Sequence, residues 1–457
     1  MIIKPDLDIN EIEPEKLFLS HQKKFQSFNS DIQEIYKNNP NRDKIITLLD
    51  YWVFNIYCLK KFYGKDGLID FCDGHLTNPQ RFSFLYEFSN YSKGTALKKS
   101  LSNKYIFKIL NFFLRRLYLP GASLKSFASK IHNRLSLYYI YSLPAEENLT
   151  RKENLFMLLD KLMTSYLSEN EIAIVKHKIP KFFYSKKVRH HQKSDLIYLE
   201  GSCASFLEFS GYENILLLDA MLKIEGYQHG GGYDIFKIDY FAEYEKRLSD
   251  VFYGWGFSND NKPQNKFKKI NDSQIIKSDQ KRVFWIEDSA VPSFYFCSMP
   301  QHHYQSINKK TKSYIFDELD KQDIKYSNLF HPISKSSLYN NFRKDDHLLS
   351  GNGHSENIIN QDDILIFDNS GSTLIHFAIE NNISFYSIIS RQDFNNFTAL
   401  QQQYFLMLQK YDLGFYNDEI GKMGASILLI ISDPDYSLPQ ELHNLNNSMF
   451  KNNMPSL

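Results

Sequence analysis

Cysteine is scarce in this chain of 457 residues, which has only four: Cys58, Cys72, Cys203 and Cys297. No two of them have the CxxC spacing of a metal site, and four are too few for a disulfide scaffold. We therefore expect reduced cysteines in the core of a cytosolic protein.

Long apolar runs are also missing. No stretch approaches the ~18 residues that cross a bilayer. The start from Met1 to Glu15 is polar and acidic, unlike a signal peptide. The net charge is only +1, so the overall electrostatic field selects no partner. These absences favour a cytoplasmic protein, at most peripheral at the inner membrane.

Acidic residues are absent between Asn90 and Ala145, where ten Lys or Arg alternate with Phe, Tyr and Leu. A core helix with a solvated basic face is the plainest interpretation. Such a stretch also suits an anionic membrane surface, and basic residues interleaved with aromatics suit nucleic acid. We expect peripheral contact with a membrane as the functional alternative and no nucleic-acid partner.

The most informative stretch is 224–257, IEGYQHGGGYDIFKIDYFAEYEKRLSDVFYGWGF. It predicts a strand, a glycine turn, a helix over 239–248 and a strand over 251–257. The turn glycines leave backbone N–H groups and room for a ligand. His229 follows the strand, at the edge where open α/β sheets bind ligands. A tight turn with a structural histidine is the alternative. No G-x-S-x-G accompanies it, so a lipase-type site is excluded.

Apolar and amphipathic segments alternate along the rest of the chain, which predicts α/β architecture with a doubly wound parallel sheet. We expect further strands at 194–200, 283–287, 363–367 and 384–389, and one strand that ends at 329–332. We expect helices at 15–37, 45–62, 154–167, 212–223, 314–321, 374–380 and 401–411. Residues 426–431 fit a strand or a helix end, and the tail after Asp433 should be frayed.

Five regions follow from this pattern. They are a mainly helical part (1–170), a Rossmann-like part of a first domain (171–257), a polar linker (258–281), a Rossmann-like second domain (282–435) and a tail (436–457).

Three further groups are candidates for function. Glu200 stands at the end of a strand, and Asp73 stands in an acidic-Gly pair after a helix. Asp368 opens a turn before a helix, followed by Ser370, Gly371, Ser372 and Thr373. Helix N-termini and hydroxyls favour a phosphate, although Ser and Thr are also ordinary N-caps.

The motifs resemble two groups of known enzymes. Gln228, His229, Gly230, Gly231, Gly232 and Tyr233, then Glu243, Asp250 and Gly254-Trp255-Gly256, are similar to the signature of bacterial surface-carbohydrate transferases. His331-Pro332, with Ser372 and Thr373, resembles the donor motifs of CMP-sugar (Kdo and sialic acid) transferases. The chain departs from the first signature at Asp234, Phe257, His376 and Ser384.

The resemblance implies a GT-B glycosyltransferase with two Rossmann-like domains facing a cleft. A nucleotide-sugar donor, preferably a CMP-sugar, would bind His331, Pro332 and the 368–373 turn. The acceptor would be a glycan or a lipid-linked sugar, activated by His229, Glu200 or Asp73 in that order. Gln228, the three glycines, Tyr233, Glu243 and Asp250 would shape the cleft loop. No metal or other cofactor is expected.

Two alternatives stay open at this stage. One is a nucleotide-sugar epimerase or a polyol-phosphate transferase on the same fold. The other is a non-catalytic membrane-adaptor protein, whose function is carried by the basic segment between Asn90 and Ala145.

Overall fold

The computed structural model describes residues 14–72, 146–186, 196–201, 203–207, 212–228, 233, 235–237, 239–254, 262–263, 281–287, 301–330, 347–348, 359–368, 372–433 and 436–444. By its contacts the chain forms two compact units. Unit 1 comprises residues 1–23, 54–68 and 225–457, and unit 2 comprises residues 24–53 and 69–224. The domain boundaries expected from the sequence stay predictions.

Helices dominate the early part of the described chain, as the apolar spacing predicts. They are α1 (Pro14–Ser27), α2 (Asn29–Tyr36), α3 (Arg42–Cys72), α8 (Leu149–Met163) and α9 (Glu169–Lys178). Helix α3 runs beyond the expected 45–62 and passes from unit 2 into unit 1. Unit 2 is held together partly by polar side chains. The Tyr36 hydroxyl donates to the carbonyl of Phe183 at 2.9 Å. The buried Asn41 amide binds the carbonyl of Ala220 and the N–H of Leu222.

A four-stranded sheet has the order β1-β2-β3-β4. Its strands are β1 (Leu196–Gly201), β2 (Met221–Tyr227), β3 (Val251–Gly254) and β4 (Lys262–Pro263), with α10 (Ala204–Leu207) and α11 (Tyr240–Leu248) between them. Strand β3 pairs in parallel with both β2 and β4. The buried residues of β2 alternate with half-buried or exposed ones, so one face of this strand is buried.

One expectation fails around this sheet. The segment 212–223 is not one helix: it forms a 3-10 helix, η4 (Tyr212–Leu217), and then enters β2 at Met221. Its apolar residues fit either period, and the bond from Leu222 N to Asn41 fixes the start of the strand. Within the polar segment 258–281, residues 262–263 form β4.

A six-stranded parallel sheet has the order β10-β9-β8-β5-β6-β7. Its strands are β5 (Val283–Glu287), β6 (Tyr326–Phe330), β7 (His347–Leu348), β8 (Ile364–Phe367), β9 (Ser384–Ile389) and β10 (Gly414–Tyr416). Counted from β5, this is the 6-5-4-1-2-3 order of a doubly wound Rossmann-type sheet. All four residues of β8 are buried, as expected for a parallel strand covered on both faces.

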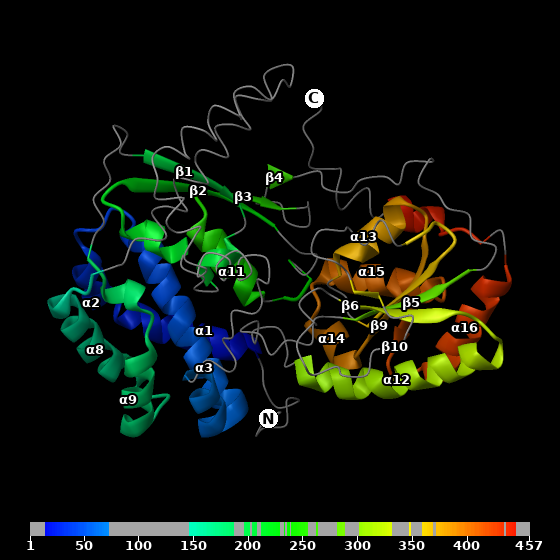
Figure 1. Cartoon of the computed structure of the whole chain (residues 1–457), viewed down its shortest axis with the longest axis horizontal. Coiled ribbons are helices and arrows are strands. Elements are labelled where there is room, and N and C mark those ends of the chain that lie inside the picture. The colour runs from blue at the N-terminus through cyan, green and yellow to red at the C-terminus, as the bar shows by residue number, and fades with distance from the viewer. Residues whose placement is uncertain are drawn as a thin grey trace, which may run out of the picture. The chain divides into compact units, whose positions relative to one another are not determined.

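Helices cover both faces of this sheet (Figure 1). They are α12 (Gln301–Lys321), α13 (Thr373–Glu380), α14 (Arg391–Asn396), α15 (Ala399–Lys410) and α16 (Ile420–Ser432). Residues 426–431 therefore belong to a helix. The start of the tail is not frayed: Leu438 and Leu442 are buried in the core of this sheet. The N–H of Leu438 donates to Asn382 Oδ1 at 3.1 Å, which fastens the tail to the domain.

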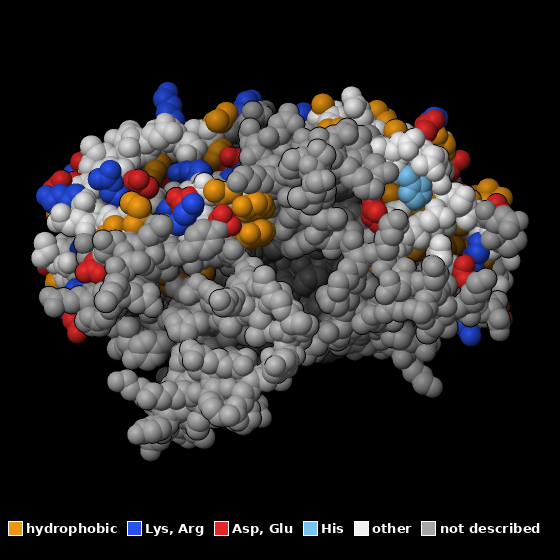
Figure 2. Space-filling model, turned by 90° about the horizontal axis from the view of Figure 1, so that it is seen from above, with side chains coloured by type: hydrophobic (Ala, Val, Ile, Leu, Met, Phe, Trp, Pro, Cys, Tyr) orange, Lys and Arg blue, Asp and Glu red, His pale blue; other side chains and the backbone are white. Residues whose placement is uncertain are grey.

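On the face drawn in Figure 2, the described Lys, Arg, Asp and Glu side chains are interspersed, in keeping with the nearly balanced composition. Among the described helices, none combines the length and the apolar character that crossing a bilayer requires.

Candidate functional site

The order in which the chain adds strands to the six-stranded sheet reverses between β5 and β8. Strand β6 pairs with one side of β5 and β8 with the other. In an open α/β sheet the connections that leave two such strands run to opposite sides of the sheet. They leave a crevice outside the carboxyl ends of the strands, and ligands bind there. The register pairs Ile286 with Phe367, so both strands end at the same level. Asp368 follows at this switch point, which makes its surroundings the candidate site.

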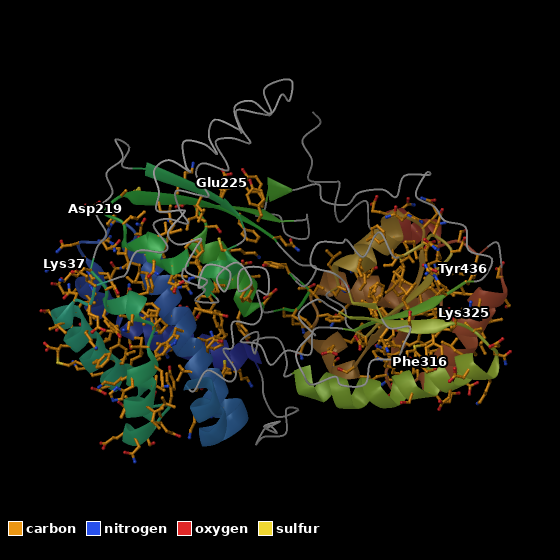
Figure 3. The ribbon with its side chains drawn as sticks, viewed as in Figure 1. Lys37, Asp219, Glu225, Phe316, Lys325 and Tyr436 are labelled. Carbon is orange, nitrogen blue, oxygen red and sulfur yellow. The ribbon has the colours of Figure 1, made fainter. Side chains whose placement is uncertain are left out.

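Asp368 is held by the central strand. The indole Nε1–H of Trp285 on β5 donates to Asp368 Oδ2 at 3.1 Å. Trp285 is fully buried and lies edge-on to Phe316, with ring centroids 6.0 Å apart. Phe316 belongs to α12 and is labelled in Figure 3. Since a buried indole has few other rotamers open to it, this contact fixes the carboxylate at the edge of the sheet.

Ser372 begins the helix behind Asp368. It is the N-cap of α13, and its Oγ accepts from the N–H of Leu374 at 3.3 Å. The cap uses an acceptor lone pair of Oγ, so the hydroxyl hydrogen can still be donated to a ligand. Thr373 is the first helical residue. The N-terminus of α13 therefore brings a hydroxyl and a positive dipole end to the switch point.

The remaining residues of the two predicted motifs are only partly placed. Ser370, Gly371, His331 and Pro332 lie outside the described residues. Strand β6 ends at Phe330, so the His-Pro pair follows a strand that pairs with β5 and not with β8. The two motifs therefore follow strands that lie on either side of β5.

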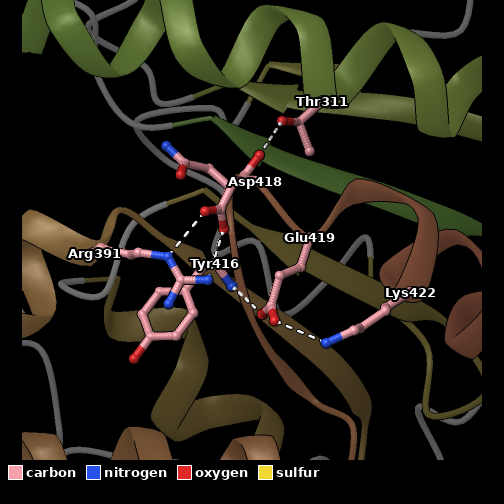
Figure 4. Close-up of polar contacts among 7 residues, drawn as sticks. Thr311, Arg391, Tyr416, Asp418, Glu419 and Lys422 are labelled. Carbon is pink, nitrogen blue, oxygen red and sulfur yellow. Dashed lines mark hydrogen bonds and ion pairs between the residues drawn. The ribbon is translucent and has the colours of Figure 1, made fainter.

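A polar network that the sequence analysis missed lies at the same edge, after β9 and β10 (Figure 4). The Arg391 guanidinium binds Asp418 through Nε at 2.9 Å and Nη2 at 3.2 Å. It also lies over the Tyr416 ring, 4.2 Å from the centroid. The hydrogen bond from Arg391 holds the pKa of Asp418 below its usual value. Sequence spacing gives no signal for this network, because its members follow different strands.

Gln228 and Tyr233 lie at the edge of the four-stranded sheet, before and after the predicted glycine motif at 229–232. The N–H of Gln228 donates to the carbonyl of Tyr253 at 2.9 Å, and the Gln228 side chain is buried. The buried Tyr233 hydroxyl donates to Glu245 on α11. Both are therefore fixed by the elements of this sheet.

Helix α11 presents Glu245, and not Glu243, to this edge. Glu245 is fully buried, whereas the Glu243 side chain is 51% exposed and lies 3.9 Å from Lys246. The helical period could have shown this, because Glu245 lies three residues from both Ala242 and Leu248 on the buried face. Asp250 is exposed.

The predicted catalytic residues are not brought together by the described part of the chain. His229, Gly230, Gly231, Gly232 and Asp73 lie outside it. Glu200 lies on β1, where the backbone alone is described. Their roles stay predictions. Within the described ranges, no group of three or more His, Cys, Asp or Glu side chains could hold a metal ion.

Comparison with known proteins adds no family: neither a family model, nor a curated protein, nor a solved structure matches the chain.

Proposed function

We propose that the chain is a glycosyltransferase of surface-polysaccharide biosynthesis that takes a sugar from a nucleotide donor, with a CMP-sugar favoured. The observation that carries this proposal is the switch point of the six-stranded sheet, where β8 leads into Asp368 and Ser372 caps the helix that follows. A GT-B arrangement, with the four-stranded sheet on the acceptor side, is part of the same proposal.

The N-terminus of α13 would receive the donor phosphate. The helix dipole and the Ser372 hydroxyl stabilise negative charge there, and the charge grows on the leaving phosphate as the glycosidic bond breaks. Asp368 is an acceptor that Trp285 holds in place. A carboxylate repels phosphate, so Asp368 suits a hydroxyl group of the ribose or of the sugar.

The acceptor hydroxyl must lose a proton during transfer. His229, Glu200 or Asp73 would take it as a general base, and the acceptor would be a glycan or a lipid-linked sugar. Peripheral binding at the inner membrane would suit a lipid-linked acceptor.

The first test is thermal unfolding in the presence of CMP, CDP, UDP, GDP and dTDP. A ligand that binds only the folded state stabilises it by ~2.7 kcal/mol at a hundredfold excess over its dissociation constant. We expect CMP to raise the midpoint most. A larger shift with UDP or GDP would keep a nucleotide-sugar enzyme but change the donor class. No shift with any nucleotide would refute the proposal.

Ser372→Ala localises the site. It removes both the phosphate ligand and an N-cap, so it lowers stability by ~1 kcal/mol and should abolish the shift caused by CMP. Asn148→Ala is the matched control, since it removes the N-cap of α8, whose side chain accepts from Arg151 N. That variant should lose similar stability and keep the CMP shift.

Product analysis then separates glycosyl transfer from its relatives on the same fold. A transferase releases CMP only when an acceptor is present. An epimerase changes the sugar without any acceptor, and a polyol-phosphate transferase moves the phosphate together with the polyol.

A further inference from the structure

The chain changes from one hydrophobic core to another within two residues. Tyr233 packs with Ala242 and Phe252, which belong to α11 and β3. Ile235 is 1% exposed and belongs to the core of the six-stranded sheet, together with Phe397. The chain then returns to α11 at Tyr240. Among the described residues in the buried core of the six-stranded sheet, Ile235 comes first along the chain, well before the polar segment 258–281.

Ile235, Phe236 and Lys237, here called the strap, are fastened by backbone hydrogen bonds. The carbonyl of Ile235 accepts from Thr398 N at 2.9 Å, and Lys237 N donates to the carbonyl of Asn396 at 2.8 Å. Phe236 forms an antiparallel bridge with Phe397, and their ring centroids lie 5.4 Å apart. Backbone hydrogen bonds beside a buried apolar anchor, here Ile235 against Phe397, resist local opening, so this is a firm attachment.

On its N-terminal side the strap leads to α11 and β3. Tyr233, two residues before Ile235, is buried, bonded to Glu245 of α11 and packed against Phe252 of β3. The strap thus joins α11 and β3, the strand that pairs with β2, to the junction between α14 and α15.

Helix α14 connects the strap to the donor edge. Its first residue, Arg391, belongs to the polar network after β9 and β10. Its last two residues bind Lys237: the carbonyl of Asn395 accepts from Lys237 Nζ at 2.9 Å, and that of Asn396 from Lys237 N. Six helical residues span ~9 Å, so a short rigid element separates the strap from the donor edge.

We propose that Ile235 is a positioning residue for the transfer reaction. It holds the β2 edge, on the acceptor side, at a fixed place relative to the domain that binds the nucleotide. This inference rests on the proposed function. When the reacting groups are already held in place, the reaction loses less orientational entropy on the way to the transition state. A misplacement of ~1 Å therefore lowers the rate by about 10²-fold.

Kinetics of Ile235→Ala test this role. We expect kcat to fall by about 10²-fold while the dissociation constant of CMP stays within twofold, because the switch point itself is untouched. Ile235→Val keeps most of the anchor and should recover most of kcat. Leu406→Ala is the matched control: it removes the same number of carbon atoms from a side chain on α15 that is 51% exposed. It should change neither constant.

Two kinetic results would overturn the proposal. One is an unchanged kcat in Ile235→Ala. The other is a parallel loss of kcat and CMP affinity, which would indicate that Ile235 serves only the packing of the second core.

Amide hydrogen exchange tests the attachment of the strap without an assay of enzymatic activity. In Ile235→Val, which removes a single methyl group, exchange should accelerate at residues 225–228 and 251–254 as well as at 396–398. Acceleration confined to 396–398 would contradict a positioning role. If the wild-type protein binds no nucleotide, the proposed function fails, and exchange still decides whether the strap holds the β2 edge.

Discussion

The Arg282→Met substitution removes the cation from an ion pair whose acid is fully buried. Arg282 binds Asp363 through Nε at 2.9 Å and Nη2 at 2.7 Å, and the N–H of Asn360 adds a bond of 2.6 Å. The Asp363 side chain has no exposed area, while that of Arg282 is 31% exposed. Burial raises the pKa of Asp363, and the bonds from Arg282 and Asn360 oppose this rise.

Methionine leaves the carboxylate buried without its charge partner, so the pKa of Asp363 rises further. Protonation then limits the loss of stability. The largest possible loss of unfolding free energy is then the cost of protonating Asp363. At pH 7, about 3 units above the ordinary pKa of an aspartate, this cost is about 4 kcal/mol, at about 1.4 kcal/mol per unit. A raised folded pKa means that the folded state binds the proton more readily than the unfolded state. The loss therefore grows as the pH rises and shrinks to about 2 kcal/mol or less at pH 5.

Urea unfolding at pH 5 and pH 7.5 measures the difference. Arg391→Met is the control, because its pair with Asp418 is more than half exposed on both sides. Such a pair should contribute little. An equal loss at both pH values, or an equal loss in the control, would refute the argument from burial.

Three further substitutions test the packing and the site. Gly226→Ala should destabilise the four-stranded sheet, since the added Cβ would lie 2.1 Å from Ser249 Oγ; thermal unfolding measures it. Trp285→Phe removes the bond to Asp368 and should weaken CMP binding about tenfold, as measured by calorimetric titration. Asn382→Ala should cost about 1–2 kcal/mol in urea unfolding, because Asn382 has a positive φ of 54° that alanine adopts poorly.

The strands of the six-stranded sheet were the most predictable part of the fold. The expected ranges 283–287 and 384–389 are those of β5 and β9. Buried parallel strands carry continuous apolar runs between polar turns, and this signal is local. The two-residue strands β4 and β7 carry no such signal, since their partners alone define them.

The candidate site was predictable where one turn supplies it. The turn from Asp368 to Thr373 reads directly from the sequence as the end of a strand and the start of a helix. The bond from Trp285 to Asp368 joins residues 83 positions apart, and no local pattern encodes it. The same holds for the strap, because Ile235 looks like any apolar residue after a turn until Phe397 is packed beside it.

Charge decides how a nucleotide would be oriented at the switch point. Asp368 and Ser372, the N-cap of α13, are four positions apart in the sequence, yet they attract groups of opposite charge character. The helix end and the Ser372 hydroxyl favour phosphate, whereas the carboxylate favours hydroxyl donors. A ligand with a phosphate beside a diol satisfies both, while a free phosphate satisfies only one and is repelled by the other. This pairing therefore favours a nucleotide over inorganic phosphate, and it does so independently of the motif resemblance.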